Sequence, residues 1–516
     1  MITQKIIDFF GITDYFILFF LTLTTYIFTF YYNYLIRPNP LPGPLPLPFI
    51  GNLYNFVYGL KSFYEQCQRK YGDICEIMIN GHRCIVISQP KYMEKFFSHS
   101  SYSGRLLYSQ GVEEIGFYGR GITLNEGYKS WNYHRQFFTY ALLAPRFMDT
   151  TINFTNKLYK EMSGYWQSLG KQNTLSNNYD NKNWILETDF HGWFHCFAND
   201  LISIVTTGER TYTIASYYNT QSTIKSEHPD ALVEDGYKFV NANVNFIKDI
   251  IFFIFDEIIK NRRKKIEEMP LDKDMNSDML TLLITANTTK SIAKVKALDG
   301  KMLKPMSDEE IRINLLEAIL GGTDTTSNLF CLITYYLCKY PHVKQKMILE
   351  IDSIFPKSSE KFNVSRNDIS KLKYCKAIIK ETNRIIPVAM FTPRCTVGEC
   401  EFAGYKWPTS THFHLNIIGA NNHPKFWSNP EIFDPDRFYD DNKYDQKFVD
   451  KNFIMFGGGH RVCPGRKLAM TEILLLMALV FKSYNVELVD INKPLKFDVG
   501  AVASCQELKV RISPRI

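Results

Sequence analysis

The sequence predicts a mainly α-helical chain with an N-terminal helix that can cross a membrane, and three patterns indicate this. Residues 15–36 are apolar and carry no charge. Ser307 and Glu310 have the spacing of a helix-capping box and open a long apolar helical pattern. Further helical patterns lie at 372–379 and 468–475, where apolar residues recur three and four positions apart.

Length and composition limit the classes of function. The chain has 516 residues and a net charge of +7, and no linker rich in Gly and Ser divides it after the N-terminal segments. We therefore expect one large domain over 53–516. No arm rich in Arg and Lys is present, so we expect no nucleic-acid partner, whereas the charge suits an anionic membrane or an acidic protein. The 11 scattered cysteines favour a reduced compartment over a disulfide framework.

Residues 1–36 are expected to form a single-pass membrane anchor. The uncharged run of 22 residues at 15–36 would span about 33 Å as a helix, enough for a bilayer core. Tyrosines cluster at its C-terminal end and Arg37 follows, which places the rest of the chain in the cytosol. The alternative is a cleaved signal peptide, which the length of the run and the lack of a small-residue cleavage site disfavour.

Residues 37–52 are rich in proline and are expected to form a hinge. Proline restricts φ and has no N–H, so the segment is interpreted as a semi-rigid extended spacer. A ligand for SH3-like domains is the alternative interpretation. The position directly after a membrane span favours the spacer.

The segment Phe456–Gly465 presents one cysteine on a glycine-rich loop that leads into a helical pattern. A helix N-terminus favours the thiolate of Cys463, and Pro464 suits the first helical position. Arg461 can meet an anionic group, and the glycines allow the backbone to approach something flat. A buried structural cysteine is one alternative. Zinc bound by His460 and Cys463 is another, but the nearest further cysteine pair has no matching histidine.

This loop resembles the haem-binding loop of the cytochrome P450 family. Phe456, Gly459, Arg461, Cys463 and Gly465 occupy the five fixed places of that loop. The resemblance implies that these residues bind haem b and that the Cys463 thiolate is the axial ligand of its iron.

A second motif interrupts the helix that begins after Ser307 and extends to about Cys338. Residues 321–326 contain two glycines and three threonines, and each interior glycine costs about 1 kcal/mol against alanine. The glycines could form a packing notch or a kink, or they could leave room above a flat cofactor. The hexapeptide resembles the distal-helix motif of the P450 family. The resemblance implies that Asp324 and Thr325 are catalytic and deliver protons to bound dioxygen.

Glu381 and Arg384 lie three residues apart on a helical pattern, where a surface ion pair is the ordinary interpretation. They resemble the Glu-x-x-Arg element of the family, whose third partner would be Arg437. The resemblance implies a structural brace for the cysteine loop. Asn383 stands at a place that is usually apolar, and we expect it to face solvent.

Trp131 and Arg135 are four residues apart on a predicted helix. They resemble the pair that contacts the haem propionates in the family, and Arg394 occupies a similar place after the Glu-x-x-Arg helix. A guanidinium suits a carboxylate because it can donate two parallel hydrogen bonds. Ordinary surface arginines are the alternative.

The resemblance extends over about 37–516 and implies the P450 fold, a large helical part with a smaller β-rich part, with the haem between the Thr325 helix and the Cys463 loop. It implies a monooxygenase that inserts one oxygen atom from O2 into a lipophilic substrate. The implied location is the endoplasmic reticulum membrane, and the implied electron donor is NADPH–cytochrome P450 reductase, with cytochrome b5 as a second donor. Arg466, Lys467 and their neighbours would suit an acidic donor.

Two other functions remain as alternatives. One is a haem-thiolate isomerase or dehydratase that acts on peroxides, which the intact Asp324–Thr325 pair disfavours. The other is a membrane-anchored haem binder without turnover. By analogy with the family, the substrate pocket is expected near residues 101–121, 231–246, 315–322, 387–394 and 500–505.

Overall fold

The computed structural model describes residues 11–79, 81–98, 104–105, 116–117, 119–143, 145–173, 184–226, 228, 248–269, 278–286, 288, 304–356, 362–499 and 502–515. Most of these residues are helical, as the sequence predicts. The helices are α2 (Ile12–Leu35), α3 (Leu60–Tyr71), α4 (Pro90–Ser98), α6 (Tyr128–Leu143), α7 (Pro145–Asn173), α8 (Phe190–Thr207), α9 (Thr213–Gln221), α11 (Lys248–Glu267), α12 (Met279–Thr285), α13 (Asp308–Lys339), α14 (Pro341–Ile354), α15 (Arg366–Lys371), α16 (Lys373–Ile385), α17 (Ile417–Asn421), α18 (Gln446–Asn452) and α19 (Arg466–Ser483).

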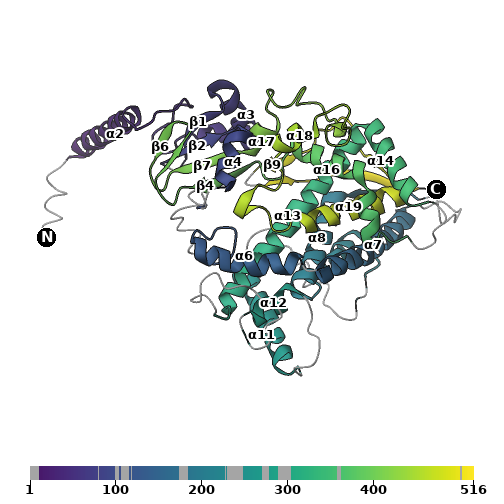
Figure 1. The fold of residues 1–516 in the computed structure, drawn as a ribbon. Helices are drawn as coiled ribbons and strands as arrows, with labels where there is room; N and C mark the ends of the chain where they lie inside the picture. Colours follow the sequence, from purple (N-terminus) through teal and green to yellow (C-terminus); the bar gives the residue numbers. More distant parts are fainter. Residues whose placement is uncertain are drawn as a thin grey trace.

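The strands form small sheets beside the helical part (Figure 1). The largest sheet has the order β1-β2-β7-β4, in which only β2 and β7 are parallel. The strands are β1 (Ile74–Ile79), β2 (His82–Ile87), β3 (Leu186–Asp189), β4 (Phe391–Cys395), β5 (Cys400–Phe402), β6 (Tyr405–Trp407), β7 (His412–Asn416), β8 (Tyr484–Leu488), β9 (Phe497–Val499), β10 (Ala503–Cys505) and β11 (Lys509–Pro514).

The centre of the helical part is α13, which packs along α8 and also contacts α11, α16 and α19. The predicted capping box opens α13, because the Ser307 hydroxyl accepts from the Glu310 amide while the Glu310 carboxylate accepts from the Ser307 amide. Helix α19 is apolar on all sides and its residues 472–481 are buried, as expected of a helix surrounded by others. These two helices bring the Thr325 motif and the Cys463 loop into one core.

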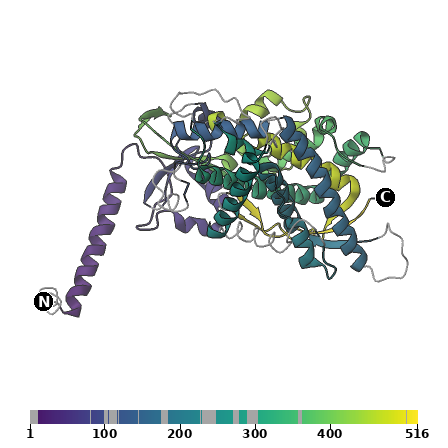
Figure 2. The same cartoon turned by 90° about the horizontal axis from the view of Figure 1, so that it is seen from below.

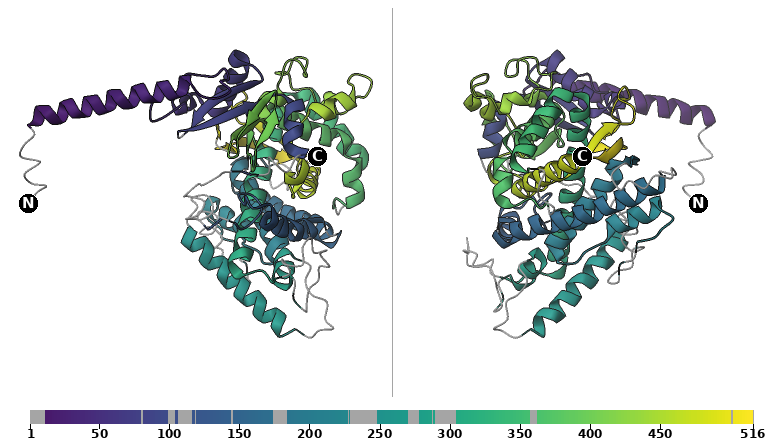
Figure 3. Two further views of the ribbon diagram at one scale, coloured as in Figure 1. Left: turned by 60° about the vertical axis from the view of Figure 1, so that its left-hand side comes forward. Right: turned by 90° about the vertical axis from the view of Figure 1, so that its right-hand side faces the viewer.

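The N-terminal helix α2 projects away from the rest of the chain in all views (Figures 1, 2 and 3). Its most apolar stretch of 18 residues has a mean hydropathy of 1.5, and none of that stretch is buried. At about 1.5 Å per residue the helix is long enough to cross a bilayer. Its composition and exposure are therefore compatible with a membrane anchor.

The proline-rich segment after α2 is extended and packs against β1. The buried Glu76 of β1 forms ion pairs with Arg37 and Arg83. A Cβ on Gly43 would lie 2.0 Å from the carbonyl oxygen of Glu76, so the chain approaches β1 too closely for any side chain there. The side chain of Asn52 closes the segment by accepting from the Met78 amide. The segment is thus held by side chains as well as stiffened by its prolines.

Candidate active site

Cys463 lies between a short 3-10 turn, Gly459–Arg461, and the start of α19. Its amide donates to the carbonyl of Phe456 at 2.9 Å, which closes the loop. Helix α19 begins at Arg466 with Gly465 as its N-cap, so Pro464 lies just outside the helix. The expectation that Pro464 is the first helical residue is wrong, because the turn at Pro464 and Gly465 delays the helix by two residues.

Packing within the protein accounts for two glycines of this loop. A Cβ on Gly459 would lie 1.5 Å from the backbone oxygen of Phe97 in α4, and a Cβ on Gly458 would lie 2.7 Å from the Phe97 ring. Gly459 also has a φ of +59°, which disfavours any side chain. By contrast, a Cβ on Gly465 would lie 4.0 Å from the Cys463 Sγ, an ordinary contact. Gly458 and Gly459 therefore let the loop dock on α4.

Burial raises the pKa of the Cys463 thiol. The amides of Gly465 and Arg466 and the guanidinium groups of Arg135 and Arg466 act in the opposite direction. A cation in contact with the sulfur would stabilise a thiolate at this buried position, and a haem iron supplies such a cation.

Four arginine side chains gather beside the loop: Arg105, Arg135, Arg394 and Arg461. Burial, together with neighbouring arginines, lowers the pKa of Arg461 to about 9 and that of Arg105 to about 10, although the Glu317 carboxylate acts on both in the opposite direction. Burial and the charges of Arg105 and Arg461 also place the pKa of Arg394 well below its ordinary value. Arg105 and Arg394 both donate to the Thr392 hydroxyl, at 2.7 and 2.9 Å.

This cluster fits the propionates of a haem. Among the residues that the structure describes, the Nε atoms of Arg105 and Arg394 are buried without a hydrogen-bond partner. Buried, mutually repelling cations are costly unless an anionic group compensates them. Two carboxylates on one flat ligand would provide that compensation and would accept paired hydrogen bonds from guanidinium groups. Sequence reasoning missed Arg105, which has no motif around it.

Trp131 and Arg135 lie on α6, as predicted, and support the same cluster. The Arg461 guanidinium carbon lies 4.4 Å from the centre of the Trp131 ring. The indole N–H donates to the Ile122 carbonyl at 3.1 Å, and Arg461 donates to the same carbonyl at 3.0 Å. Trp131 therefore positions Arg461 through its ring face and a shared acceptor. Arg135 donates to the Val462 carbonyl beside the cysteine.

A buried carboxylate on α13 was not predicted from the sequence. Glu317 accepts from the amides of Ile122 and Thr123 at 2.6 and 2.9 Å. Burial raises its pKa to about 7, although these amides act in the opposite direction. Its one sequence signal is a charged residue inside an otherwise apolar stretch, 315–320. The same loop carries the Ile122 carbonyl, which accepts from Arg461. Glu317 therefore fixes this loop to α13.

The two glycines of the distal motif serve different purposes. A Cβ on Gly321 would contact nothing within 4 Å, and this residue is exposed to open space. A Cβ on Gly322 would lie 2.7 Å from the Ile202 side chain of α8. The packing-notch interpretation thus holds for Gly322, whereas Gly321 faces open space.

Asp324 and Thr325 follow on the same helix. The Thr325 hydroxyl donates to the Gly321 carbonyl at 2.6 Å, which leaves its lone pairs available as acceptors. Asp324 Oδ1 lies 2.9 Å from His195 Nε2 on α8. The side chain of Asp324 is 51% exposed, although the helix as a whole is largely buried. An acid and a hydroxyl therefore sit beside the open space at Gly321.

Glu381, Arg384 and Arg437 form a fully buried ion cluster. Arg384 donates to both carboxylate oxygens of Glu381, at 2.7 and 2.8 Å, and Arg437 Nε lies 3.5 Å from the same carboxylate. Arg384 also donates to the Asn421 carbonyl, and the Asn421 side chain binds both the amide and the carbonyl of Ile454, two residues before Phe456. These bonds connect the cluster to the cysteine loop.

Asn383 does not face solvent, contrary to expectation. It is 3% exposed, and its Oδ1 has no hydrogen-bond partner among the described residues. Helix α16 is covered on several sides by α13, α14 and α19, so few of its positions reach water. An amide at this place is buried by the tertiary arrangement, which periodicity on a single helix does not reveal.

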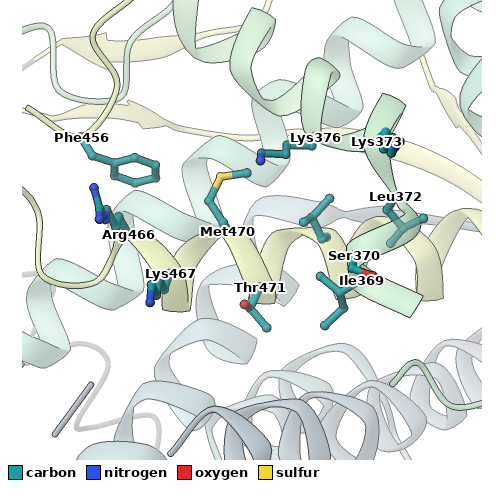
Figure 4. Close-up of a pocket in the computed structure, with 11 residues that line it drawn as sticks. Ile369, Ser370, Leu372, Lys373, Lys376, Phe456, Arg466, Lys467, Met470 and Thr471 are labelled. Atoms are coloured by element: carbon teal, nitrogen blue, oxygen red, sulfur yellow. The ribbon is translucent and has the colours of Figure 1, made fainter. Parts of the chain in front are cut away.

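A groove of about 520 Å³ lies beside the cysteine loop, on the outer side of α19 (Figure 4). Its floor is apolar and its rim is basic. The lining residues are Ile369, Ser370, Leu372, Lys373, Lys376, Phe456, Arg466, Lys467, Met470, Thr471 and Leu474. Within the described ranges, none of the four cationic groups forms an ion pair. Lys373 and Lys376 join Arg466 and Lys467 in one positive rim.

Most of the expected pocket segments 101–121 and 231–246 lie outside the described residues, as do 500 and 501. Strand β10 contacts the segment 387–394 and the helix α13. The Ala503 amide donates to the Val388 carbonyl, and the Cys505 amide donates to Asn328 Oδ1 of α13 at 2.7 Å. These bonds connect the segments 387–394 and 502–505 to each other and to Asn328 of α13, which follows the segment 315–322 on the same helix.

Comparison with known proteins agrees with this geometry. The family profile described as Cytochrome P450 matches residues 41–512. Salviol synthase of Salvia pomifera is 25% identical over 481 residues, 90% of this chain and 88% of its own length. Cytochrome P450 3A25 of Mus musculus is 25% identical over 473 residues, 87% of this chain and 85% of its own.

A shorter match is closer in sequence. Tabersonine 3-oxygenase of Catharanthus roseus is 34% identical over 189 residues, 36% of this chain and 37% of its own length. The family match covers nearly the whole chain and includes both the distal motif and the cysteine loop. The chain belongs to the cytochrome P450 family and is a P450 monooxygenase with a cysteine-ligated haem iron.

Proposed function

We propose that this protein is a membrane-anchored monooxygenase that inserts one oxygen atom from O2 into a lipophilic substrate, with haem b held by Cys463. The observation that carries the proposal is the cluster of buried, mutually repelling arginines between the Cys463 loop and α13. Arg105, Arg135, Arg394 and Arg461 would bind the propionates, and the Nε atoms of Arg105 and Arg394 are buried without a hydrogen-bond partner among the described residues.

The haem, when bound, supplies dioxygen activation, and the residues of this chain supply position and protons. Thr325 is proposed to accept a hydrogen bond from a group in the open space at Gly321, since its own proton is committed to the Gly321 carbonyl. Asp324 is proposed to deliver protons to that same space. Glu381, Arg384 and Arg437 are proposed to hold the segment that carries Cys463.

The substrate is proposed to be lipophilic. Leu320, Val388 and Phe391 come from the segments that meet around the distal helix, and all three are apolar. The membrane anchor, residues 1–36, would keep this domain where such molecules concentrate. We propose the division 1–36, 37–52 and 53–516 for anchor, hinge and catalytic domain, and the endoplasmic reticulum as the membrane.

The electron donor is proposed to be NADPH–cytochrome P450 reductase, with cytochrome b5 as a second donor. The basic rim of the groove in Figure 4 lies on the cysteine side and is not neutralised by described acidic residues. Opposite charge on a partner would accelerate its encounter with this face, and the apolar floor would contribute buried area once it is docked.

The test is spectroscopic first and functional second. The reduced protein should show the CO difference band of a haem thiolate, and Cys463→Ala should lose it while Cys400→Ala, a half-buried cysteine away from the site, should keep it. A band that persists in Cys463→Ala would overturn the proposed ligand.

Lipophilic compounds from several classes should then be screened for reductase-dependent NADPH consumption and an oxygenated product. Product formed from a peroxide without reductase would favour an isomerase or dehydratase. Haem binding with no consumption for any compound would favour a binder without turnover.

A further inference from the structure

We infer that His195 is a positioning residue that orients the Asp324 carboxylate toward the distal pocket. The inference rests on the proposed role of Asp324 and extends it to α8, where no sequence motif is present. The carrying observation is the contact between His195 Nε2 and Asp324 Oδ1 at 2.9 Å across two helices, 129 residues apart in the chain.

The burial of the two side chains suits a role in which His195 orients the Asp324 carboxylate. The His195 side chain is 11% exposed and the Asp324 side chain is 51% exposed, so the imidazole lies in the wall while the carboxylate reaches open space. With its Nε2 protonated, His195 donates to one carboxylate oxygen. The second oxygen is left to carry a proton toward Thr325.

Packing and hydrogen bonds oppose movement of α8, which carries His195, along α13, which carries Asp324. Ile202 of α8 packs directly on Gly322, where a Cβ would come within 2.7 Å of its side chain. The first turn of α8 is fixed by the Asp189 side chain, which accepts from the His191 amide at 3.0 Å. Asp189 also accepts from the Leu508 amide, which ties this end of the helix to β11.

The remaining contacts of Asp324 do not set its side chain. Ser327 and Asn328 donate to the Asp324 backbone carbonyl, and Asn328 is in turn held by the Cys505 amide. An aspartate has several staggered side-chain rotamers on a helix. A single donor from α8 selects the rotamer in which one oxygen is bound and the other is available.

His191 provides a matched control on the same helix. Its ring centre lies 5.9 Å from that of His195, and burial and the His195 charge lower its pKa, whereas the Asp189 and Asp324 carboxylates act in the opposite direction. Among the described contacts, His191 makes no hydrogen bond to Asp324 through its side chain. A substitution of His191 perturbs the packing of α8 without removing the donor.

The experiment compares His195→Phe, which fills the space without donating, with His195→Gln, whose amide can replace the Nε2–H. Product formed per NADPH consumed should fall on the order of tenfold in His195→Phe, because an unoriented acid delivers protons poorly. The value should be largely restored in His195→Gln and unchanged in His191→Phe. A retained ratio in His195→Phe, or a loss in His195→Gln equal to that in His195→Phe, would overturn the positioning role.

A second readout does not depend on turnover. Denaturant midpoints of the wild type, His195→Phe, Asp324→Asn and the double variant form a mutant cycle, and the two single losses should not add if the side chains interact. Additive losses would overturn the inference. The wild type and each variant must first show the CO difference band. A wild type without the band marks failure of the proposed function, whereas the His195 role is judged from variants that keep the band.

Discussion

The two glycine-rich segments of the site look alike in sequence but differ in what their glycines contact. In the cysteine loop, Gly458 and Gly459 leave room for Phe97 of α4. In the distal helix, Gly322 leaves room for Ile202, whereas Gly321 faces open space. Three of these four glycines therefore serve protein packing, whereas Gly321 leaves open volume.

The largest effect is expected for Gly459→Ala. Its Cβ would lie 1.5 Å from a backbone oxygen that cannot move aside, at a φ of +59°. We expect a loss of more than about 4 kcal/mol in unfolding free energy, or no folded protein. Gly457→Ala is the control: it has a φ of +68° but no neighbour within 4 Å, so only backbone strain of about 1–2 kcal/mol applies. Equal losses in the two variants would show that strain rather than contact governs this loop.

A next smaller effect is expected from the brace beneath the cysteine loop. Glu381→Ala leaves Arg384 and Arg437 buried without their carboxylate, which costs about 3–5 kcal/mol. Chemical denaturation would measure this loss, and haem retention should fall with it because the Asn421–Ile454 contact connects the brace to the loop. A variant that is destabilised but retains its haem would show that the ion cluster stabilises the fold without holding the cysteine loop.

The carboxylate of Glu317 should make stability depend on pH. Burial raises its pKa from 4.5 to about 7, so between these values the folded state binds more protons than the unfolded state. Stability therefore falls as pH rises through this window, by up to about 3 kcal/mol. Glu317→Gln should remove that part of the slope. Parallel stability curves for wild type and variant between pH 4.5 and 7 would contradict this assignment.

The smallest effects are expected for the distal glycines, and they should have opposite signs. Gly322→Ala pushes against the Ile202 side chain and should cost about 1–3 kcal/mol. Gly321→Ala meets nothing and should stabilise the helix by about 0.5–1 kcal/mol. It should nevertheless weaken the binding of a bulky ligand, measured by spectral titration. Unchanged ligand binding would mean that the open space at Gly321 is not part of the pocket.

The sequence by itself determined the features that depend on neighbouring residues. The capping box at Ser307, the anchor helix and the spacing of Glu381 and Arg384 are local patterns, and backbone geometry over one or two turns dictates them. The Cys463 loop and the distal hexapeptide are also contiguous, so their resemblance to one family was visible without coordinates. The matched family profile over 41–512 confirms that resemblance.

Only the tertiary structure decided which distant residues meet. Arg105 joins the arginine cluster, and His195 contacts Asp324, although no pattern marks either residue. Asn383 is buried and Glu317 is desolvated because other helices and loops cover them. Helical periodicity defines faces of one element, whereas burial, pKa and the reason for each glycine depend on what another element places against that face.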